Sequence, residues 1–208
     1  MENKIKAIIF DFGNIFVSYD PWEKYKYLES ITGIKKEELR KIVGKIADPL
    51  VKGIIGVEEF WKRLSEKISK DLPGKGYDWW LIGAKFRIHW DIVRLARKLK
   101  EKGYKVALLT NTIEPHYNLH VKEGHYTLVD FDTIVASNKV KMKKPEKAIY
   151  IYTLEKLGVK PQEAVFIDDL EENIRAAREV GIHVIQFDAT KDDVRVLVDE
   201  LKKLGIEI

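Results

Sequence analysis

Short apolar stretches recur along this chain, and from the second onward they alternate with segments whose apolar residues have helical spacing. The stretches read KAIIF, KVALLT, TIVAS, AVFID and HVIQF, and they are rich in the β-branched and aromatic residues typical of strands. Alternating strands and helices predict a parallel sheet covered by helices on both faces. We therefore expect an α/β protein with a doubly wound parallel sheet.

Two segments before predicted strands have the clearest helical periodicity. In DIVRLARKLKEKGY the apolar residues Ile92, Leu95, Ala96 and Leu99 share one helical face, and Gly103 follows as a stop signal. The segment PEKAIYIYTLEKLGV has the same character. Both are typical of helices that return the chain to the next parallel strand.

The first and second stretches are separated by about 90 residues, far more than a crossover between parallel strands needs. Within this segment PWEKYKYLESITGI, KKEELRKIVGKIADPLV and GVEEFWKRLSEKI have helical spacing and are broken by Gly or Pro. We expect a helical cap over residues 20–85, inserted into a core formed by residues 1–19 and 86–208. Such a cap would lie over the sheet edge where open α/β sheets bind ligands.

Composition narrows the possible classes of function. The chain has 208 residues, 45% hydrophobic and 34% charged, which is typical of a globular protein. It has no cysteine, which excludes disulfides and thiolate metal sites, and its first apolar run is too short for a signal peptide. No stretch approaches the roughly 20 apolar residues of a membrane span. We expect a cytoplasmic protein without a membrane partner.

Charge is scattered rather than clustered. The 37 basic and 33 acidic residues give a net charge of +4 without a block of one sign, so we expect no nucleic-acid partner. Abundant Lys and Glu without Cys favour a thermophile as the source. The oligomeric state stays open.

Polar groups suited to catalysis follow several predicted strands. They are Asp11 and Gly13 after the first stretch, Thr110 and Asn111 after the second, Lys144 before a proline, and Asp168 and Asp169 after AVFID. Each alone fits a turn, a helix cap or a solvated side chain. A carboxylate, a hydroxyl, an amide, a lysine and an acidic pair at successive strand ends together indicate one active site.

In these segments the chain resembles the haloacid dehalogenase superfamily. FDFGN resembles its first motif, LLTNT the second, KMKKPEKAIY the lysine motif and FIDDLEENIRAAREVG the fourth, so the resemblance spans nearly the whole chain. It implies a Rossmann-like core with an inserted helical cap, as in many small-molecule phosphatases. Gly-Asn after the first motif's Asp and a hydrophobic residue is similar to the subgroup that includes bacterial glucose-1-phosphate phosphatase.

The resemblance implies a Mg²⁺-dependent phosphatase that acts on small phosphorylated metabolites. Asp11 would be the nucleophile, forming an aspartyl-phosphate that water then cleaves. The metal would be held by Asp11, Asp169 and the Gly13 carbonyl, with Asp168 either a ligand or a group behind the ligands.

Phosphate binding is implied for three further residues. Lys144 would neutralise charge on the phosphoryl group, while the Thr110 hydroxyl and the Asn111 backbone amide would hold its oxygens. All these roles are electrostatic or positional, as phosphoryl transfer requires.

The chain departs from the family pattern at Gly13. Most phosphatases of the superfamily have a second aspartate there, which protonates the leaving group and later activates water. Such help is typically worth about 10²- to 10⁴-fold. Asp20 is the nearest acidic substitute, although it would equally cap the helix that starts at Pro21.

Histidines and aromatic residues provide weaker signals. His116 and His120 have the spacing of a zinc site, but Tyr117 stands where a zinc protease needs Glu, so we interpret both as surface histidines. An aromatic group near the end of the cap could line a pocket or pack the hinge, and we favour packing. It comprises Tyr77, Trp79, Trp80, Phe86 and Trp90.

Two alternative functions stay open. In carbon–halogen hydrolysis the same Asp11 would attack carbon, but such an enzyme needs no metal, and the pair Asp168 and Asp169 argues against it. A regulatory protein that binds a phosphorylated ligand would have lost catalysis at Gly13. Retention of Asp11 and Lys144 favours the enzyme.

Overall fold

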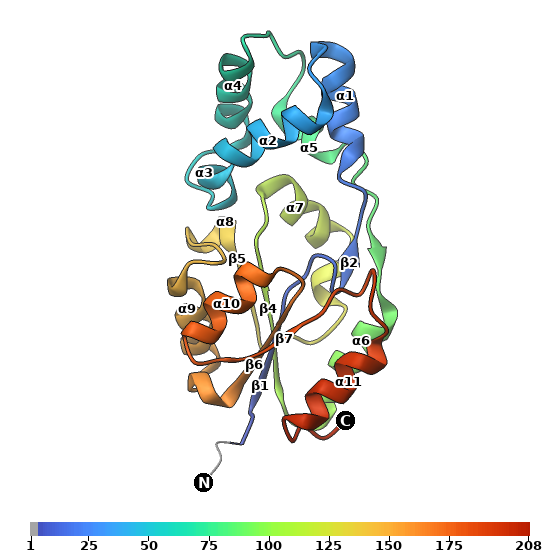
Figure 1. The fold of residues 1–208 in the computed structure, drawn as a ribbon, viewed down its shortest axis with the longest axis vertical. Coiled ribbons are helices and arrows are strands. Elements are labelled where there is room, and N and C mark those ends of the chain that lie inside the picture. Colours follow the sequence, from blue (N-terminus) through green and yellow to red (C-terminus); the bar gives the residue numbers. More distant parts are fainter. Residues whose placement is uncertain (1–3) are drawn as a thin grey trace.

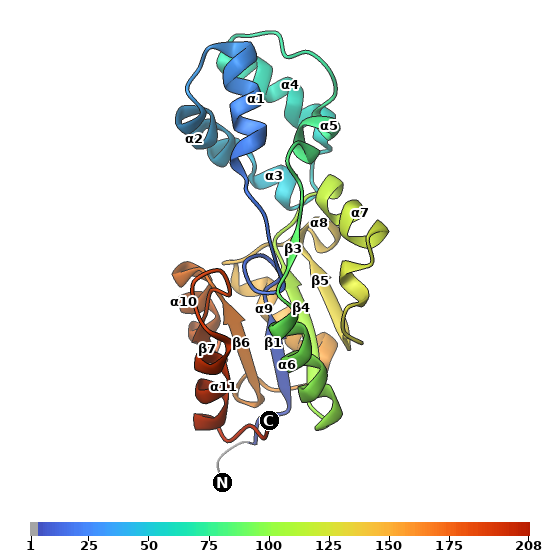
Figure 2. The same ribbon diagram turned by 90° about the vertical axis from the view of Figure 1, so that its right-hand side faces the viewer.

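The core is a five-stranded parallel sheet in the computed structural model, which describes residues 4–208 (Figures 1 and 2). The strand order is β5-β4-β1-β6-β7. The bounds are β1 Ala7–Phe10, β4 Lys105–Thr110, β5 Thr133–Ala136, β6 Ala164–Asp168 and β7 His183–Gln186. Each strand lies in one of the five predicted stretches, and all pairings are parallel, which confirms the fold class.

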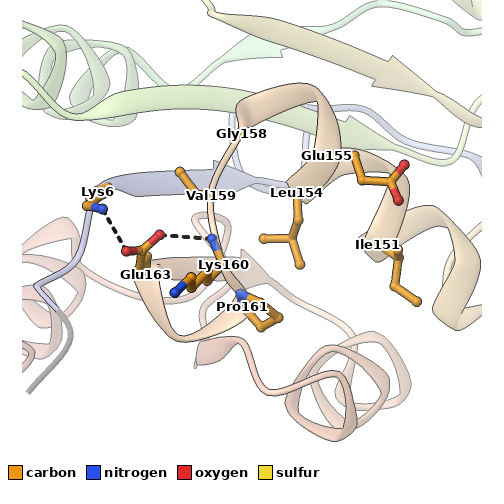
Figure 3. Close-up of a pocket in the computed structure, with 9 residues that line it drawn as sticks. All are labelled: Lys6, Ile151, Leu154, Glu155, Gly158, Val159, Lys160, Pro161 and Glu163. Atoms are coloured by element: carbon orange, nitrogen blue, oxygen red, sulfur yellow. Dashed lines mark hydrogen bonds and ion pairs between the residues drawn. The ribbon is translucent and has the colours of Figure 1, made fainter.

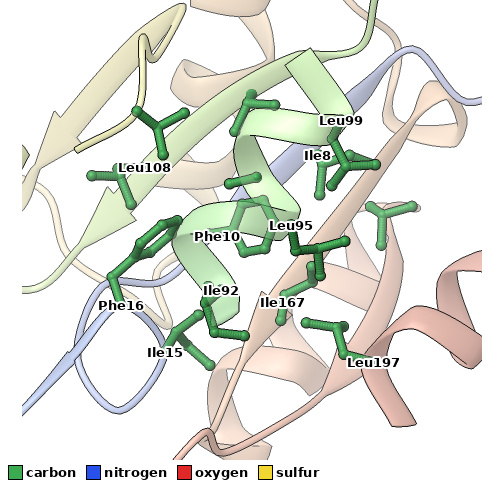
Figure 4. Close-up of a cluster of buried hydrophobic side chains, with 14 of the residues drawn as sticks. Ile8, Phe10, Ile15, Phe16, Ile92, Leu95, Leu99, Leu108, Ile167 and Leu197 are labelled. Atoms are coloured by element: carbon green, nitrogen blue, oxygen red, sulfur yellow. The ribbon is translucent and has the colours of Figure 1, made fainter. Parts of the chain in front are cut away.

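Helices cover both faces of the sheet because side chains of a strand alternate between faces. From β1, Ile8 and Phe10 pack with helices α6 (Trp90–Glu101) and α11 (Val194–Lys203), as Figure 4 shows. On the other face Ala7 and Ile9 pack with α9 (Lys147–Leu157) and α10 (Glu171–Glu179). The sheet is therefore buried on both sides, which explains its continuous apolar strands.

Five helices form the inserted unit, which lies beyond the carboxyl ends of the strands (Figure 1). They are α1 Trp22–Thr32, α2 Lys36–Ile46, α3 Asp48–Val51, α4 Val57–Ile68 and α5 Gly76–Leu81. They share a hydrophobic cluster in which Leu28, Phe60 and Leu64 are fully buried. Residues 1–3 of the predicted core segment lie outside the described residues.

Two short strands connect the core to the cap. Strand β2 (Val17–Ser18) leaves the core and pairs antiparallel with β3 (Arg87–Ile88), which returns to it. Two residues cannot display a periodicity, so the sequence did not predict this pair. The pairing holds the outgoing and returning chain side by side at the base of the cap (Figure 2).

Several short elements complete the chain around the carboxyl edge and the loops. They are α7 Glu114–Lys122, α8 Ser137–Val140, and the 3-10 helices His125–Thr127 and Pro161–Glu163. Helix α7 touches the cap, because the His116 ring nitrogen Nε2 lies 2.9 Å from the Trp80 carbonyl oxygen. Within residues 4–208, no helix has the length and apolar character needed to cross a membrane.

Candidate active site

Three adjacent strands bring the predicted site residues together. Asp11 directly follows β1, Thr110 ends β4 and Asp168 ends β6, and β1 lies between the other two. Lys144 reaches this edge from the loop before α9, and its Nζ lies 2.6 Å from Asp11 Oδ1 and 2.7 Å from Asp168 Oδ2. The lysine and both aspartates are buried, so one ammonium group links two strand ends away from solvent.

The pKa values of Asp11, Lys144 and Asp169 are shifted from their ordinary values by burial and by neighbouring charges. Burial raises the pKa of Asp11, and Lys144 opposes that shift while Asp168 adds to it. Burial by itself lowers the pKa of Lys144, but Asp11 and Asp168 raise it by more. The pKa of Lys144 therefore lies above its ordinary value, and the lysine stays charged. Burial also raises the pKa of Asp169, despite a hydrogen bond from Asn14. Three carboxylates lie around one ammonium group, so the cluster has an excess of negative charge that a bound cation would balance.

Asp168 is held by more than the lysine. Asn173 Nδ2 donates to both carboxylate oxygens of Asp168, at 2.9 and 3.1 Å, and the Leu170 amide donates to Oδ1 at 2.8 Å. Both oxygens therefore have partners before any ligand binds. Sequence reasoning missed Asn173. Its signal was its position in the fourth motif, five residues after Asp168 and on the first turns of α10.

The side chain of Asn111 positions the lysine loop. Its Oδ1 accepts a hydrogen bond from the Lys144 amide, and its Nδ2 donates to the Lys144 carbonyl, both at 2.9 Å. The sequence led us to expect only the Asn111 backbone amide to act, so this side-chain role is new. It links the loop after β4 to the loop that carries the lysine.

Asn14 joins the first and fourth motifs. Its Nδ2 donates to Asp169 Oδ2 at 2.9 Å, and its φ of 54° is left-handed, a conformation that Asn tolerates better than most residues. Gly13, in contrast, does not have a left-handed φ, and a Cβ placed on it would meet no atom within 4 Å. Of the Gly-Asn pair it is therefore the Asn that uses the unusual backbone angle.

The donor set suits a hard divalent cation. Asp11, Asp168 and Asp169 each offer a carboxylate oxygen, and these oxygens lie within 4.8 Å of one another. Oxygen-only donors with excess negative charge match Mg²⁺ rather than a soft metal. The residues present therefore fit the metal that the sequence led us to expect.

A pocket of about 190 Å³ opens beside this cluster. Its walls come from the first motif, the link to the cap, the second motif and α7. The lining residues are Phe12, Gly13, Asn14, Val17, Tyr19, Phe86, Thr110, Asn111, Thr112, His116 and His120. Thr110 and Asn111 thus face the same space as Gly13, as expected for a phosphate site.

The interpretation of two histidines as surface residues is wrong. His116 is 9% exposed and His120 4% exposed, and both line the pocket. The ring of His120 packs 4.2 Å from that of Phe86 and 4.8 Å from that of Phe12, measured between centroids. Helix α7 has a weak amphipathic pattern, because polar histidines occupy its buried face, and this hid their burial from the sequence.

Asp20 binds a backbone amide at the start of helix α1. Its Oδ1 accepts a hydrogen bond from the Trp22 amide at 2.9 Å, at the start of α1, and the residue is exposed. It is not among the residues that line the pocket. Helix α1 begins at Trp22 with Pro21 as its N-cap residue, and Asp20, one residue earlier, accepts from the first helical amide.

The five aromatic residues near the end of the cap have different roles. Trp79 and Trp80 are buried and Tyr77 is partly buried in the cap cluster, so packing is confirmed for these three. Phe86 instead lines the pocket. Trp90 is 51% exposed at the start of α6, and it neither packs in the cap cluster nor lines this pocket.

A larger cavity, of about 590 Å³, lies at the opposite end of the sheet (Figure 3). It is lined by Lys6, just before β1, and by Glu163, just before β6. These two side chains neutralise each other at 2.6 Å. Among residues 4–208, no catalytic groups converge on this cavity, so the smaller pocket at the carboxyl edge is the candidate active site.

Comparisons with known proteins agree on one family. Residues 5–181 match the sequence model of the haloacid dehalogenase-like hydrolases. The chain is 29% identical to the sesquiterpene phosphatase of Aspergillus oryzae, covering 93% of this chain and 96% of that protein. It is also 29% identical to acyl-CoA dehydrogenase family member 10 of mouse over 92% of its length, but it spans only 19% of that protein.

A solved structure with similar coordinates comes from Bacteroides thetaiotaomicron. It is an enzyme of the haloacid dehalogenase family in complex with magnesium and inorganic phosphate. The TM-score is 0.74 at 28% identity, covering 92% of this chain and 98% of that one. The similarity extends across both the sheet and the inserted helices.

Proposed function

Because the chain belongs to the haloacid dehalogenase-like hydrolase family, we propose that it is a Mg²⁺-dependent phosphatase of small phosphorylated metabolites that works through a phospho-Asp11 intermediate. One observation carries the proposal: Lys144 bonds Asp11 and Asp168 at once, beside Asp169, and the neighbouring residues Gly13 and Thr110 line a small pocket. The phosphatase among the relatives and the neighbour with magnesium and phosphate support it.

Asp11 is the nucleophile in this proposal. Its carboxylate attacks phosphorus, the ester oxygen departs, and water later releases phosphate from the aspartyl group. Lys144 holds Asp11 and balances the charge of the incoming phosphate. Thr110 and the Asn111 amide, which face the same pocket, bind phosphoryl oxygens.

The magnesium ion would be held by Asp11, Asp169 and the Gly13 carbonyl. When bound, it supplies the positive charge that lets a carboxylate approach an anionic phosphate. Asp168 has both oxygens engaged by Lys144, Asn173 and Leu170, so we assign it to positioning the lysine. Asn14 fixes Asp169 from the other side.

Protonation of the leaving group is the weak point of this site. Gly13 stands where a carboxylic acid would donate the proton, and Asp20 is engaged at the start of α1. The enzyme should therefore favour esters whose leaving oxygen needs little protonation.

The proposal is tested by phosphate release from p-nitrophenyl phosphate with and without Mg²⁺, using Asp11→Asn as the matched control. Asn keeps the size of Asp but cannot form the acyl-phosphate. We expect release that requires Mg²⁺ and is abolished in the variant. Metal-independent halide release from a 2-haloacid would support a dehalogenase instead, and binding of phosphate without turnover would support a regulatory protein.

A further inference from the structure

One short stretch of the cap touches both loops that carry the proposed phosphate-binding residues. This stretch is the α3 segment, residues 48–53, which comprises helix α3 and the next two residues. Figure 1 shows α3 beside α8, which precedes the lysine loop, residues 141–146. The α3 segment does not line the active-site pocket, so it can act on the reaction only through the loops that it touches.

Four side chains of alternating charge cross from the α3 segment to the lysine loop. Lys143 Nζ lies 2.8 Å from Asp48 Oδ1, and Lys52 Nζ lies 2.5 Å from Glu146 Oε1. Within the cap, Lys52 Nζ also lies 3.2 Å from Asp48 Oδ2. Within the loop, the Glu146 amide donates to the Lys143 carbonyl oxygen at 2.9 Å. Lys144 therefore lies between two residues whose side chains are both held by the cap.

A buried serine joins the α3 segment to the other loop, which carries Thr110 and Asn111. Ser137 is fully buried, and its Oγ accepts a hydrogen bond from the Thr112 amide at 2.9 Å. The hydroxyl has one hydrogen to donate, and the Val51 carbonyl oxygen, at 2.7 Å, is a nearer acceptor than the Thr112 carbonyl oxygen, at 3.1 Å. Through Ser137 the cap backbone is linked to the residue that follows Asn111.

The end of the α3 segment lies too close to the core backbone for a side chain to fit. A Cβ placed on Gly53 would overlap the main-chain carbonyl of Asn138, and the Gly53 φ of 63° is left-handed. Lys141 Nζ also donates to the Gly53 carbonyl oxygen. A main-chain carbonyl cannot turn aside as a flexible side chain can. The α3 segment therefore has one close-fitting position on the core.

The charged contacts are better suited to positioning than to stabilising the fold. The four side chains are between 19% and 46% exposed, and exposed ion pairs contribute little to stability unless several charges form a network. Here the charges form such a network, and both of its connections to the core flank Lys144.

We propose that the α3 segment holds the two phosphate-binding loops in the geometry of phosphoryl transfer, so that Asp48, Lys52 and Gly53 are positioning residues that do not touch the substrate. This inference rests on the proposed function. Donors stabilise the transferring phosphoryl group only when they are held in place beforehand, and a misplacement of about 1 Å can cost about 10²-fold in rate. Displacement of the α3 segment would misplace both loops at once.

The first test compares Gly53→Ala with Gly33→Ala. Both glycines belong to the cap and have a left-handed φ, 63° and 73°, so both variants carry a similar backbone penalty. A Cβ on Gly33 meets no atom within 4 Å, whereas a Cβ on Gly53 overlaps the core. We expect kcat for p-nitrophenyl phosphate to fall about tenfold or more in Gly53→Ala and to stay near that of wild type in Gly33→Ala. Equal kcat values in the two folded variants would overturn the proposal.

A charge exchange tests the network without changing the backbone. Lys52→Glu places a carboxylate opposite Glu146 and should lower kcat by about threefold or more. The double variant Lys52→Glu/Glu146→Lys restores opposite charges across the boundary and should recover most of the loss. A merely structural effect of the substitutions would instead make the double variant at least as poor as the single one, and that result would contradict the positioning role.

Amide hydrogen exchange of the peptide that contains residues 141–146 follows the loop without turnover. The Lys144 and Glu146 amides donate hydrogen bonds there, to Asn111 Oδ1 and to the Lys143 carbonyl oxygen. We expect faster exchange of this peptide in Gly53→Ala and Lys52→Glu than in wild type and Gly33→Ala.

The outcomes distinguish this inference from the proposed function. If wild type releases phosphate from no ester, the proposed function falls and the positioning role falls with it. If wild type releases phosphate while kcat and exchange are the same in all folded variants, only the positioning role falls. A change in one of these two measurements without the other would also overturn it. Melting curves show which variants are folded, and the charge exchange stands even if Gly53→Ala is not.

Discussion

Substitution of Gly13 by Asp should restore the proton donor that the site lacks. The position accepts a side chain, because a Cβ there meets no atom within 4 Å and the backbone φ is not left-handed. The fold therefore presents no steric or backbone obstacle to the substitution. A placed carboxylic acid contributes about 10²- to 10⁴-fold where the leaving group needs a proton.

Charge repulsion opposes this gain. Two like charges 4 Å apart interact by about 4 kcal/mol at an effective dielectric constant of about 20, which is comparable to the gain itself. The repulsion acts on the bound phosphate whatever the leaving group, whereas the proton helps only poor leaving groups. The ratio of kcat/KM for an aryl phosphate to that for an alkyl phosphate is therefore the informative quantity.

We expect Gly13→Asp to narrow the aryl-to-alkyl ratio by about 10- to 100-fold, mainly by accelerating the alkyl ester. The assay measures p-nitrophenyl phosphate and n-propyl phosphate in parallel, after a melting curve shows that the variant is folded. Gly13→Asn is the matched control, since it has the same size without the acid and should leave the ratio near that of wild type. An unchanged ratio in folded Gly13→Asp would refute the reasoning and mean that another group already supplies the proton.

Three further predictions concern the cap, the lysine loop and the metal. Burial lowers the pKa of Lys24 from 10.5 to about 8, and no carboxylate in residues 4–208 pairs with it, so Lys24→Met should stabilise the protein by about 1 to 3 kcal/mol below pH 8. This gain should disappear as the pH rises from 8 to 10.5, where the folded wild type loses the charge; a pH-independent gain in urea unfolding would contradict it. Asn111→Ala removes two hydrogen bonds to the Lys144 backbone and should lower kcat by at least tenfold, with Asn111→Asp retaining one bond and more activity; equal kcat in wild type and Asn111→Ala would exclude the positioning role. Ca²⁺ should inhibit, because its larger and more flexible shell disturbs the geometry that Mg²⁺ favours; equal rates with both ions would count against the assigned ligands.

The sheet was predictable because its three central strands, β1, β4 and β6, are buried on both faces. Val106 to Leu109 in β4 and Val165 to Ile167 in β6 are fully buried, and such strands are continuous apolar runs in the sequence. The grouping of site residues at the carboxyl edge was predictable as well, because adjacent parallel strands place Asp11, Thr110 and Asp168 side by side. The short pair β2 and β3 has too few residues to show any pattern.

The supporting side chains of the site could not be predicted from patterns. Asn14, Asn111 and Asn173 act through side-chain hydrogen bonds to partners that lie 155, 33 and 5 residues away. The burial of His116 and His120 depends on the link to the cap passing over α7, and only the three-dimensional arrangement shows it. The narrower similarity to glucose-1-phosphate phosphatase stays a prediction, since the comparisons support the family and not that subgroup.

Phosphorylation of Asp11 during turnover is the most direct test of the proposed mechanism. The enzyme is mixed with p-nitrophenyl phosphate and Mg²⁺, quenched in acid within the first turnover, and digested for peptide mass spectrometry. We predict a base-labile phosphate on the peptide that contains Asp11, present with Mg²⁺, absent without it and absent in Asp11→Asn. Steady phosphate release with no label on that peptide, or undiminished release by Asp11→Asn, would contradict the mechanism.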